Sequence, residues 1–129
     1  MRYLLLIHGN PTIWAHPIFL NPPEPVTGAE TSGMRDQFDA LLAEITNSGE
    51  LLDSAALAAP GTSRIIRERG GVPMVTDGPY TESKEQLAGY FLLECDSEQR
   101  AVEIAGRFPD IRFGTVELRP VMNLSGVEM

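Results

Sequence analysis

The sequence predicts one α+β domain with a split βαβ arrangement, into which a β-hairpin is inserted. The first reason is the length of 129 residues, which suits a single core that buries roughly two thirds of the surface of the unfolded chain. The second is the order of the predicted elements, which run strand, helix, strand, strand, helix, strand when the hairpin is set aside. The third is that each helix has one apolar stripe, so both helices can cover the same face of an antiparallel sheet.

The first half of the chain is predicted to form a strand, a long loop, a helix and a second strand. Residues 3–7 are continuously apolar, as expected of a central strand that is covered on both faces. Prolines recur through residues 9–26, so this stretch is predicted to be an extended loop, of a kind that often serves as a lid. Residues 51–57 form the second predicted strand.

The helix between these strands is predicted from apolar residues at helical spacing, namely Met34, Phe38, Leu41, Leu42 and Ile45. Its first free amides can be capped by Thr31 or Ser32, or earlier by a capping box of Thr27 and Glu30. Gly49 is placed to cap its end.

An inserted hairpin is predicted after the second strand. Residues 64–69 and 72–76 flank Gly70 and Gly71, a composition typical of a two-residue hairpin turn. Residues 88–95, which are apolar and aromatic, form the strand that returns to the main sheet.

The second helix and the last strand complete the domain. Asp96 or Ser97 can cap the helix, and Pro109 ends it. Its apolar face consists of Ala101, Ile104, Ala105 and Phe108. Residues 115–121 alternate between apolar and polar side chains, which predicts a strand with one buried face.

Composition and charge limit the function classes. The formal net charge of −8 disfavours binding to nucleic acid, and the densest basic cluster, Arg64, Arg67 and Arg69, is too small to offset it. Cys95 is the single cysteine, which excludes an intrachain disulfide and favours a reducing, cytoplasmic location. The apolar run of residues 3–7 is too short for a secretory signal or a membrane span, so we expect no membrane association.

The predicted arrangement leaves one face of the sheet without cover, because both helices lie on the other face. In a chain of this length, a second copy is the simplest cover. The sequence therefore predicts a homodimer in which the two sheets pack face to face.

Residues 77–90 combine a turn, a polar segment predicted to begin a short helix, and the entry to a strand. Gly78 tolerates a positive φ and Pro79 has no amide donor, so the turn that starts at Asp77 ends the preceding strand. The polar residues 81–85 then place several titratable side chains in one loop beside the sheet edge. A functional site is expected at such a loop.

Asp77 and His8 are the candidate catalytic residues. A loop position beside a pocket can bury Asp77 and suit it to general-base chemistry, although Asp before Gly is also a common turn former. His8 follows the first predicted strand, and histidine titrates near neutral pH, so it can shuttle a proton or simply be satisfied by backbone hydrogen bonds.

The candidate ligand-binding residues are Trp14, Tyr80, Glu82 and Lys84. Lys84 can hold an anionic group, or it can belong with Glu82 to a solvated helix start, where surface ion pairs contribute little. Trp14 and Tyr80 can pack against a ligand, as can Tyr90 through its hydroxyl, or they can serve packing alone.

No cofactor or metal site is predicted. The histidines and the single cysteine lack metal-ligand spacing. The glycine-rich nucleotide motifs and the nucleophile elbow of hydrolases do not occur.

The sequence resembles the YCII-related proteins of the DGPF group. The resemblance is carried by residues 3–10, by Asp77-Gly78-Pro79-Tyr80 with Glu82, Lys84 and Glu85, and by Phe113-Gly114 with residues 117–121. It spans nearly the whole chain and implies a ferredoxin-like α/β fold. It also implies pairing into a dimeric barrel with a pocket between helices and sheet, but no particular reaction.

Two departures from this family bear on function. Tyr80 replaces the usual Phe, which adds a hydroxyl group. Related proteins are associated with a His and Asp pair whose histidine lies early in the first helix, whereas residues 34–42 of this chain contain no histidine.

The expected function is therefore that of a small dimer that binds a small organic molecule, with cofactor-free acid–base chemistry by Asp77 and His8. The alternative is a non-catalytic ligand-binding or regulatory module. The family resemblance implies that such a module works with sigma-factor-type transcription regulators.

Overall fold

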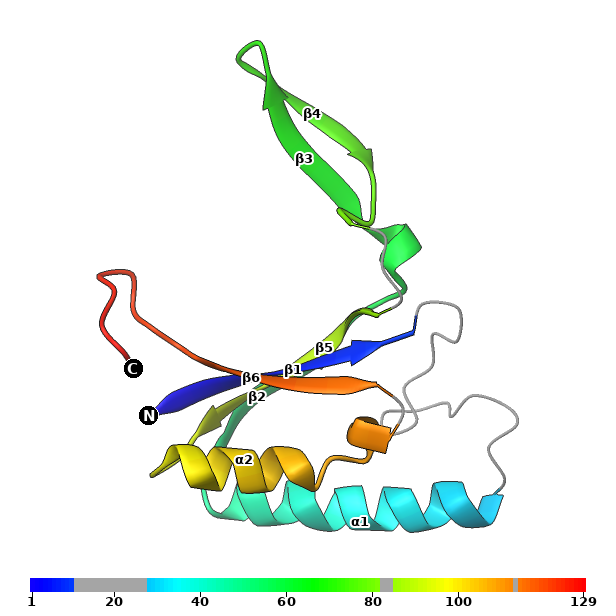
Figure 1. The fold of residues 1–129 in the computed structure, drawn as a ribbon, viewed down its shortest axis with the longest axis vertical. Coiled ribbons are helices and arrows are strands. Elements are labelled where there is room, and N and C mark those ends of the chain that lie inside the picture. The colour runs from blue at the N-terminus through cyan, green and yellow to red at the C-terminus, as the bar shows by residue number, and fades with distance from the viewer. Residues whose placement is uncertain (11–27, 82–84, 113) are drawn as a thin grey trace.

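The computed structural model describes residues 1–10, 28–81, 85–112 and 114–129. Its main sheet contains β1 (Arg2–Gly9), β2 (Leu51–Ala56), β5 (Gln86–Glu94) and β6 (Thr115–Pro120). These four strands lie in the order β2-β5-β1-β6, and each is antiparallel to its neighbours. In the described part of the chain, α1 (Gly28–Asn47) and α2 (Glu98–Gly106) lie on one face of this sheet (Figure 1).

This arrangement confirms the predicted α+β class and is compatible with a ferredoxin-like fold. The β2 strand, which follows α1, pairs directly with β5, which follows the hairpin. The β1 strand lies between β5 and β6, so each helix connects two strands that have a third strand between them. That is the split βαβ arrangement.

The core lies between the sheet and the two helices. Tyr3, Leu5 and Ile7 of β1 point into it, because alternate residues of a strand face the same side. Three phenylalanines from different elements meet at its centre: Phe38 from α1, Phe91 from β5 and Phe108 after α2. Their ring centroids are 4.9 to 6.0 Å apart in edge-to-face contacts, a favoured geometry for aromatic pairs.

The structure confirms one of the two predicted caps of α2 and the glycine at the end of α1, but Thr31 and Ser32 lie inside α1 and so are not its N-cap. The Ser97 hydroxyl accepts a hydrogen bond from the Arg100 amide at 3.1 Å, so Ser97 and not Asp96 is the N-cap of α2. The first helix begins at Gly28, nearer the earlier of the two predicted starts, and Gly49 follows its end with a φ of 82°. Pro109 does not directly end α2, because the helix stops at Gly106 and Pro109 begins the short 3₁₀ turn η3 (Pro109–Arg112).

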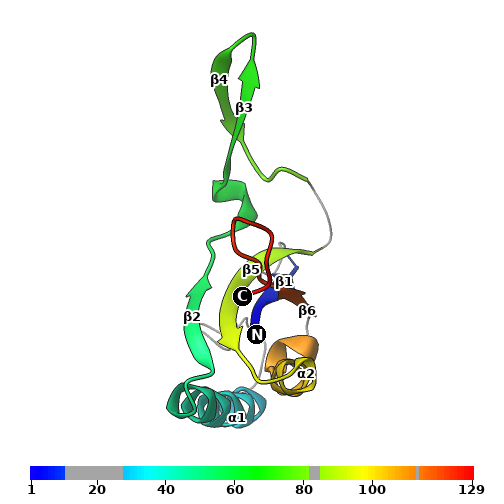
Figure 2. The ribbon, with the colours of Figure 1, turned by 90° about the vertical axis from the view of Figure 1, so that its left-hand side faces the viewer.

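The inserted hairpin is present as β3 (Arg64–Arg69) and β4 (Val72–Asp77). Gly70 and Gly71 both have a positive φ, 59° and 80°, which is the backbone geometry of the turn that matches the twist of a tight hairpin. The hairpin forms its own two-stranded sheet and extends away from the main sheet, on the side opposite the helices (Figures 1 and 2). We call β3 and β4 the arm.

Most strand boundaries agree with the prediction to within a single residue, and the largest shifts are in β1 and β5. The β1 strand extends over Arg2–Gly9, and β5 begins at Gln86. Both extensions have the same cause, because His8 and Gly9 pair with Leu87 and Gln86 after an irregularity in the register. The predicted polar helix start falls mainly on residues 82–84, outside the described residues.

Candidate functional site

The candidate site is the sheet face that the helices do not cover, which we call the open face. Since Tyr3, Leu5 and Ile7 point into the core, the alternate residues Leu4, Leu6 and His8 point to the open face. Cross-strand partners share a face, which adds side chains from the other strands. These are Asp53 and Ala55 of β2, Tyr90, Leu92 and Glu94 of β5, and Thr115, Glu117 and Arg119 of β6.

Three polar side chains meet on this face at β1 and β6. The Nε2 atom of His8 lies 3.0 Å from Oε1 of Glu117, and both side chains are partly exposed. The guanidinium of Arg119 donates to the other carboxylate oxygen, Oε2, at 2.7 Å. One carboxylate therefore bridges an imidazole and a guanidinium, next to the apolar side chain of Leu6.

The electrostatics of this group keep Glu117 ionised. The hydrogen bond from Arg119, followed by that from His8, lowers the pKa of the Glu117 carboxyl below its ordinary value. An ionised carboxylate only accepts hydrogen bonds, so Nε2 of His8 carries a proton. In the neutral imidazole the lone pair is then on Nδ1, which makes Nδ1 the atom able to take a proton from a ligand.

Gly114 sets the position of this group. A Cβ atom built there would collide with the His8 carbonyl oxygen, so only glycine allows the chain to pass this close before β6 starts. Thr115 then pairs with His8, and Glu117 follows two residues later on the same face.

A second polar pair lies on the side of the open face formed by β2 and β5. The Tyr90 hydroxyl donates to Oδ2 of Asp53 at 3.1 Å. This hydrogen bond raises the pKa of the Tyr90 phenol, because the bonded carboxylate disfavours the phenolate. The apolar residues Leu4, Leu6 and Leu92 lie between the two polar pairs, so the face combines apolar surface with hydrogen-bonding groups.

The structure does not bring Asp77 to His8. Asp77 ends β4, its side chain is 88% exposed, and its carboxylate pairs with Arg64 of the same hairpin at 3.3 Å. The structure therefore lacks the burial that was expected to suit Asp77 to general-base chemistry. Its role as a catalytic residue stays a prediction.

The predicted ligand-binding residues are described only in part. Tyr80 is exposed, and the guanidinium of Arg67 lies over its ring, 5.1 Å from the centroid. Trp14, Glu82 and Lys84 lie outside the described residues.

Sequence reasoning did not connect His8 with Glu117. The alternation of residues 115–121 correctly separated Glu117 from the apolar face of the last strand. The missing information was that β6 pairs with β1, which joins residues that are 109 positions apart. Asp53 was missed for the same reason, because its partner Tyr90 lies on a strand that follows the inserted hairpin.

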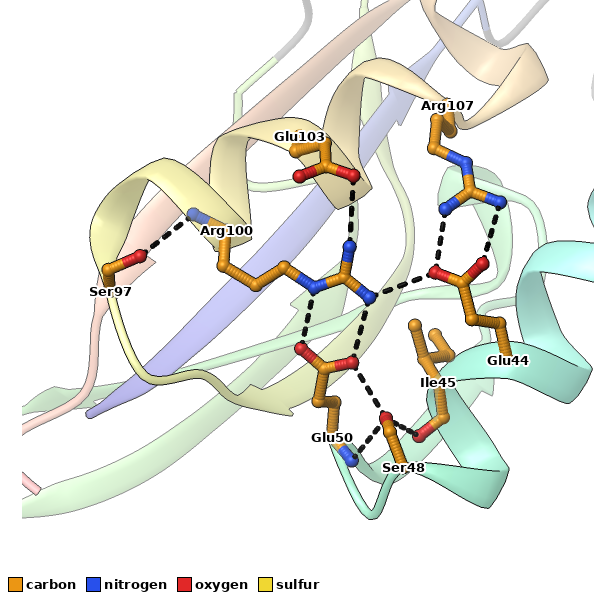
Figure 3. A network of polar contacts seen from close by, with 8 residues as sticks. All are labelled: Glu44, Ile45, Ser48, Glu50, Ser97, Arg100, Glu103 and Arg107. Atoms are coloured by element: carbon orange, nitrogen blue, oxygen red, sulfur yellow. Dashed lines mark hydrogen bonds and ion pairs between the residues drawn. The ribbon is translucent and has the colours of Figure 1, made fainter.

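The most extensive polar network lies elsewhere, between the helices, and it holds the fold together (Figure 3). Arg100 of α2 donates to both carboxylate oxygens of Glu50, at 2.8 and 2.9 Å, and also to Glu44 and Glu103. Arg107 donates to Glu44 at 2.7 Å. These bonds tie α2 to the end of α1 and to the segment before β2, and they leave no described carboxylate of the network without a partner.

A groove of about 320 Å³ lies on the outer side of the helices, between α1 and the turn after α2. Its charged lining residues are Arg107, which is bonded to Glu44, and Arg112. It contains no histidine, carboxylate or nucleophile. The open face, where His8 is hydrogen-bonded to Glu117, is therefore the better candidate for acid–base chemistry.

No helix among the described residues is long and apolar enough to cross a membrane.

Comparison with known proteins identifies the family. The model of the YCII-related domain matches residues 1–125. The chain is also similar to an uncharacterized protein of Rhizobium meliloti (strain 1021), with 32% identity over 90 residues, which cover 68% of this chain and 72% of the relative. The match to the family model spans the four strands of the main sheet and both helices, so it includes the complete open face. The chain belongs to the YCII-related family.

Proposed function

We propose that this protein is a homodimer that binds a small organic molecule at the open face, beside His8 and Glu117, and that it performs acid–base chemistry there without a cofactor. The observation that carries the proposal is the hydrogen bond between His8 and Glu117 on a sheet face that the helices leave uncovered.

The dimer is inferred from the apolar part of the open face. Leu4, Leu6 and Leu92 are only half-buried in the subunit, and a second sheet packed against them would remove them from water. Two sheets joined in this way would form the dimeric barrel that the resemblance to the DGPF group implies.

The ligand site is inferred from the polar end of the same face. If a second copy covered the His8–Glu117–Arg119 group with apolar side chains, the charged groups would lose water without gaining new partners. A pocket left at this end, occupied by a small polar molecule, avoids that cost. Arg119 and Lys84 are suited to an anionic group on that molecule, and Trp14 with Tyr80 to its apolar part.

His8 is the proposed general base. Glu117 fixes the protonated Nε2, so Nδ1 takes a proton from a carbon or oxygen acid and later returns it to the product. Asp77 is the proposed second proton-transfer group. It would reach the pocket only in the assembled dimer, because its side chain is exposed in the single subunit.

Native mass spectrometry of the purified protein tests the dimer and the ligand together. We expect a dimer mass, with an additional mass that corresponds to a small co-purified molecule. A monomer at micromolar concentration would exclude the proposed assembly.

Binding is then tested by NMR with a panel of small carboxylic acids. We expect the largest shift changes at residues of β1 and β6 near His8, and weaker binding in Glu117→Gln. The matched control is Glu103→Gln, which changes an exposed glutamate on the helical side. Equal binding by both variants would exclude Glu117 from the site.

Catalysis is tested with any compound that is found to bind. We expect Asp77→Asn and His8→Ala to abolish its turnover while the circular dichroism spectrum stays unchanged. Full activity in both variants would reject the proposed proton-transfer residues. A compound that the wild-type protein binds but does not change would make the protein a ligand-binding module.

A further inference from the structure

The arm has little support within its own subunit. Every residue of β3 and β4 except Ile65 is exposed. An isolated two-stranded hairpin is at best marginally stable in water, and it normally needs a third strand or another packed element. The arm nevertheless forms a regular ladder over its whole length, from Arg64–Asp77 to Arg69–Val72.

The exposed arm is also rich in apolar side chains. The cross-strand pair Ile66 and Val75 lies on one face of the hairpin, with exposed fractions of 69% and 61%. Val72 and Met74 lie on the other face and are exposed as well. Each face of the hairpin therefore exposes a pair of apolar side chains next to charged ones, a combination that is typical of interaction surfaces.

The arm extends to the same side of the sheet as the open face. The helices lie on one side of the main sheet and the arm on the opposite side, in both views (Figures 1 and 2). The C-terminal segment, residues 121–129, curls over the far end of the sheet on that same side. A molecule seated on the open face would therefore lie between the arm and the C-terminal segment.

We propose that the arm docks onto a second copy of this chain, the copy that packs against the open face. The inference rests on the proposed dimer and adds the arm as its second contact. Three properties of the chain favour a second copy as the occupant: area, reach and charge.

The open face alone is small for a stable interface. Four strands about 4.8 Å apart and six to nine residues long cover a flat area of roughly 400–600 Å². A standard stable interface buries about 800 Å² on each partner. The arm supplies additional apolar surface beside the open face, where a packed copy can use it.

The reach of the arm fits the thickness of one subunit. A strand of six residues is roughly 20 Å long. Packed layers are about 10 Å apart, so the arm can extend past the sheet of a second copy to the level of its helices.

The charge of the arm is opposite to that of the rest of the chain. The arm contains Arg64, Arg67 and Arg69 against Glu68 and Asp77, whereas the whole chain has a formal net charge of −8. The remainder of each subunit is therefore strongly acidic, and it attracts a basic arm from its partner.

Sedimentation velocity over a dilution series tests the docking by measuring the dimer dissociation constant. The double variant Ile66→Glu/Val75→Glu alters one face of the arm, and Val72→Glu/Met74→Glu alters the other. We expect at least one of them to raise the dissociation constant roughly tenfold or more, because it places charge in an apolar contact. The control is Val102→Glu, which changes a valine on α2 with a similar exposed fraction of 55% and should leave the dimer unchanged.

A second pair of variants tests the role of the charge on the arm. Arg69→Glu on the arm and Arg112→Glu on the helical side change the net charge equally. We expect only Arg69→Glu to weaken the dimer, and we expect high salt to reduce the difference between the two variants. Equal effects of the two variants would overturn the charge complementarity.

The outcomes separate this inference from the proposed function. A dimer that neither double arm variant weakens overturns arm docking and leaves the open-face dimer intact. A wild-type protein that stays monomeric at tens of micromolar overturns both. Hydrogen exchange adds a direct measurement: the arm amides should be protected in the wild-type dimer and exchange rapidly in a Leu4→Glu variant that cannot pair its open faces. Arm amides that exchange equally fast in both proteins overturn arm docking.

Discussion

His8 and Glu117 are joined by a hydrogen bond of 3.0 Å, although 109 positions separate them in the sequence. The bond connects the central strand β1 with the edge strand β6, on the face that carries no helix. The ionised carboxylate of Glu117 accepts this bond and thereby fixes the proton of the His8 imidazole on Nε2.

The first prediction concerns the His8 imidazole. In the wild-type protein the Nε2 proton is held by Glu117, so proton NMR should show its resonance downfield and slow to exchange. Glu117→Ala should remove this resonance, whereas Glu103→Ala, on the helical side, should retain it. A His8 N–H resonance unchanged by Glu117→Ala would contradict the assigned bond.

A second prediction follows from Gly114. Adding a methyl group there forces the chain away from the His8 backbone, because the new Cβ would overlap the His8 carbonyl oxygen. We expect Gly114→Ala to destabilise the fold by about 2 kcal/mol or more in urea unfolding, and also to disturb the His8 resonances. The control is Gly106→Ala, where the added Cβ meets no atom within 4 Å. Similar losses in both variants would mean that the close approach is unimportant.

The third prediction concerns Arg100, which binds both oxygens of Glu50 and also reaches Glu44 (Figure 3). A lysine cannot reproduce the two parallel bonds of a guanidinium. We expect Arg100→Lys to lower the free energy of unfolding by about 1–2 kcal/mol, through the lost charge-assisted hydrogen bonds. Arg112→Lys should leave stability unchanged. Equal stability of the wild type and Arg100→Lys would contradict a role of the network in joining α2 to α1.

The same network predicts a loss of stability in acid. Hydrogen bonds from Arg107 and Arg100 lower the pKa of Glu44 to about 2, compared with an ordinary value of 4.5. A depressed pKa in the folded state stabilises the fold above the unfolded-state pKa, and this stabilisation is lost as the pH falls through the folded-state pKa. Urea midpoints measured between pH 6 and pH 2 should therefore fall more steeply for the wild type than for Glu44→Gln. Parallel curves would contradict the assignment.

The fifth prediction concerns Asp110, whose pKa is raised in the folded state, in contrast to the lowered pKa of Glu44. Asp110, only 6% exposed, has a carboxylate oxygen, Oδ1, without a hydrogen-bond partner, and burial raises the pKa of this carboxyl to about 6. Because the folded-state pKa is raised, the contribution of Asp110 to stability is fully present below the unfolded-state pKa of 3.8. This contribution is lost as the pH rises towards 6.

Asp110→Asn should therefore stabilise the protein at pH 7, by roughly 1–3 kcal/mol, because it removes a charge from a buried position. The gain should shrink as the pH falls and disappear below about pH 4, near the unfolded-state pKa of Asp. Thermal unfolding at pH 4 and pH 7 measures it, with Asp36→Asn on the exposed side of α1 as the control. A gain of the same size at both pH values would show that the charge of Asp110 is not its cause.

Much of the fold could be predicted because its determinants are local. The helical spacing of Phe38, Leu41 and Ile45 produces a buried stripe wherever the helix is placed. The pair Gly70-Gly71 supplies the two positive φ angles that a tight hairpin needs. The largest shifts of strand boundaries occur where a neighbouring strand extends the ladder, as at Gln86 opposite Gly9.

The candidate site was only half predictable. His8 could be chosen from the sequence because it follows an apolar strand and because histidine is a common proton-transfer residue. Asp77 was preferred as the carboxylate because a loop position beside a pocket can bury it, but in the structure Asp77 belongs to an exposed arm and pairs with Arg64. The carboxylate beside His8 is that of Glu117, which follows from strand order and not from any local pattern.

The sequence by itself determined the elements, their order and the apolar faces that each must bury, since periodicity and turn chemistry act over a few residues. Only the tertiary structure decided which side chains meet across strands: His8 with Glu117, Tyr90 with Asp53, and Arg100 with Glu44. It also decided that the arm extends beyond the open face instead of packing on its own sheet. These relationships depend on register and strand order, which are set when the whole core packs at once and which no short segment encodes.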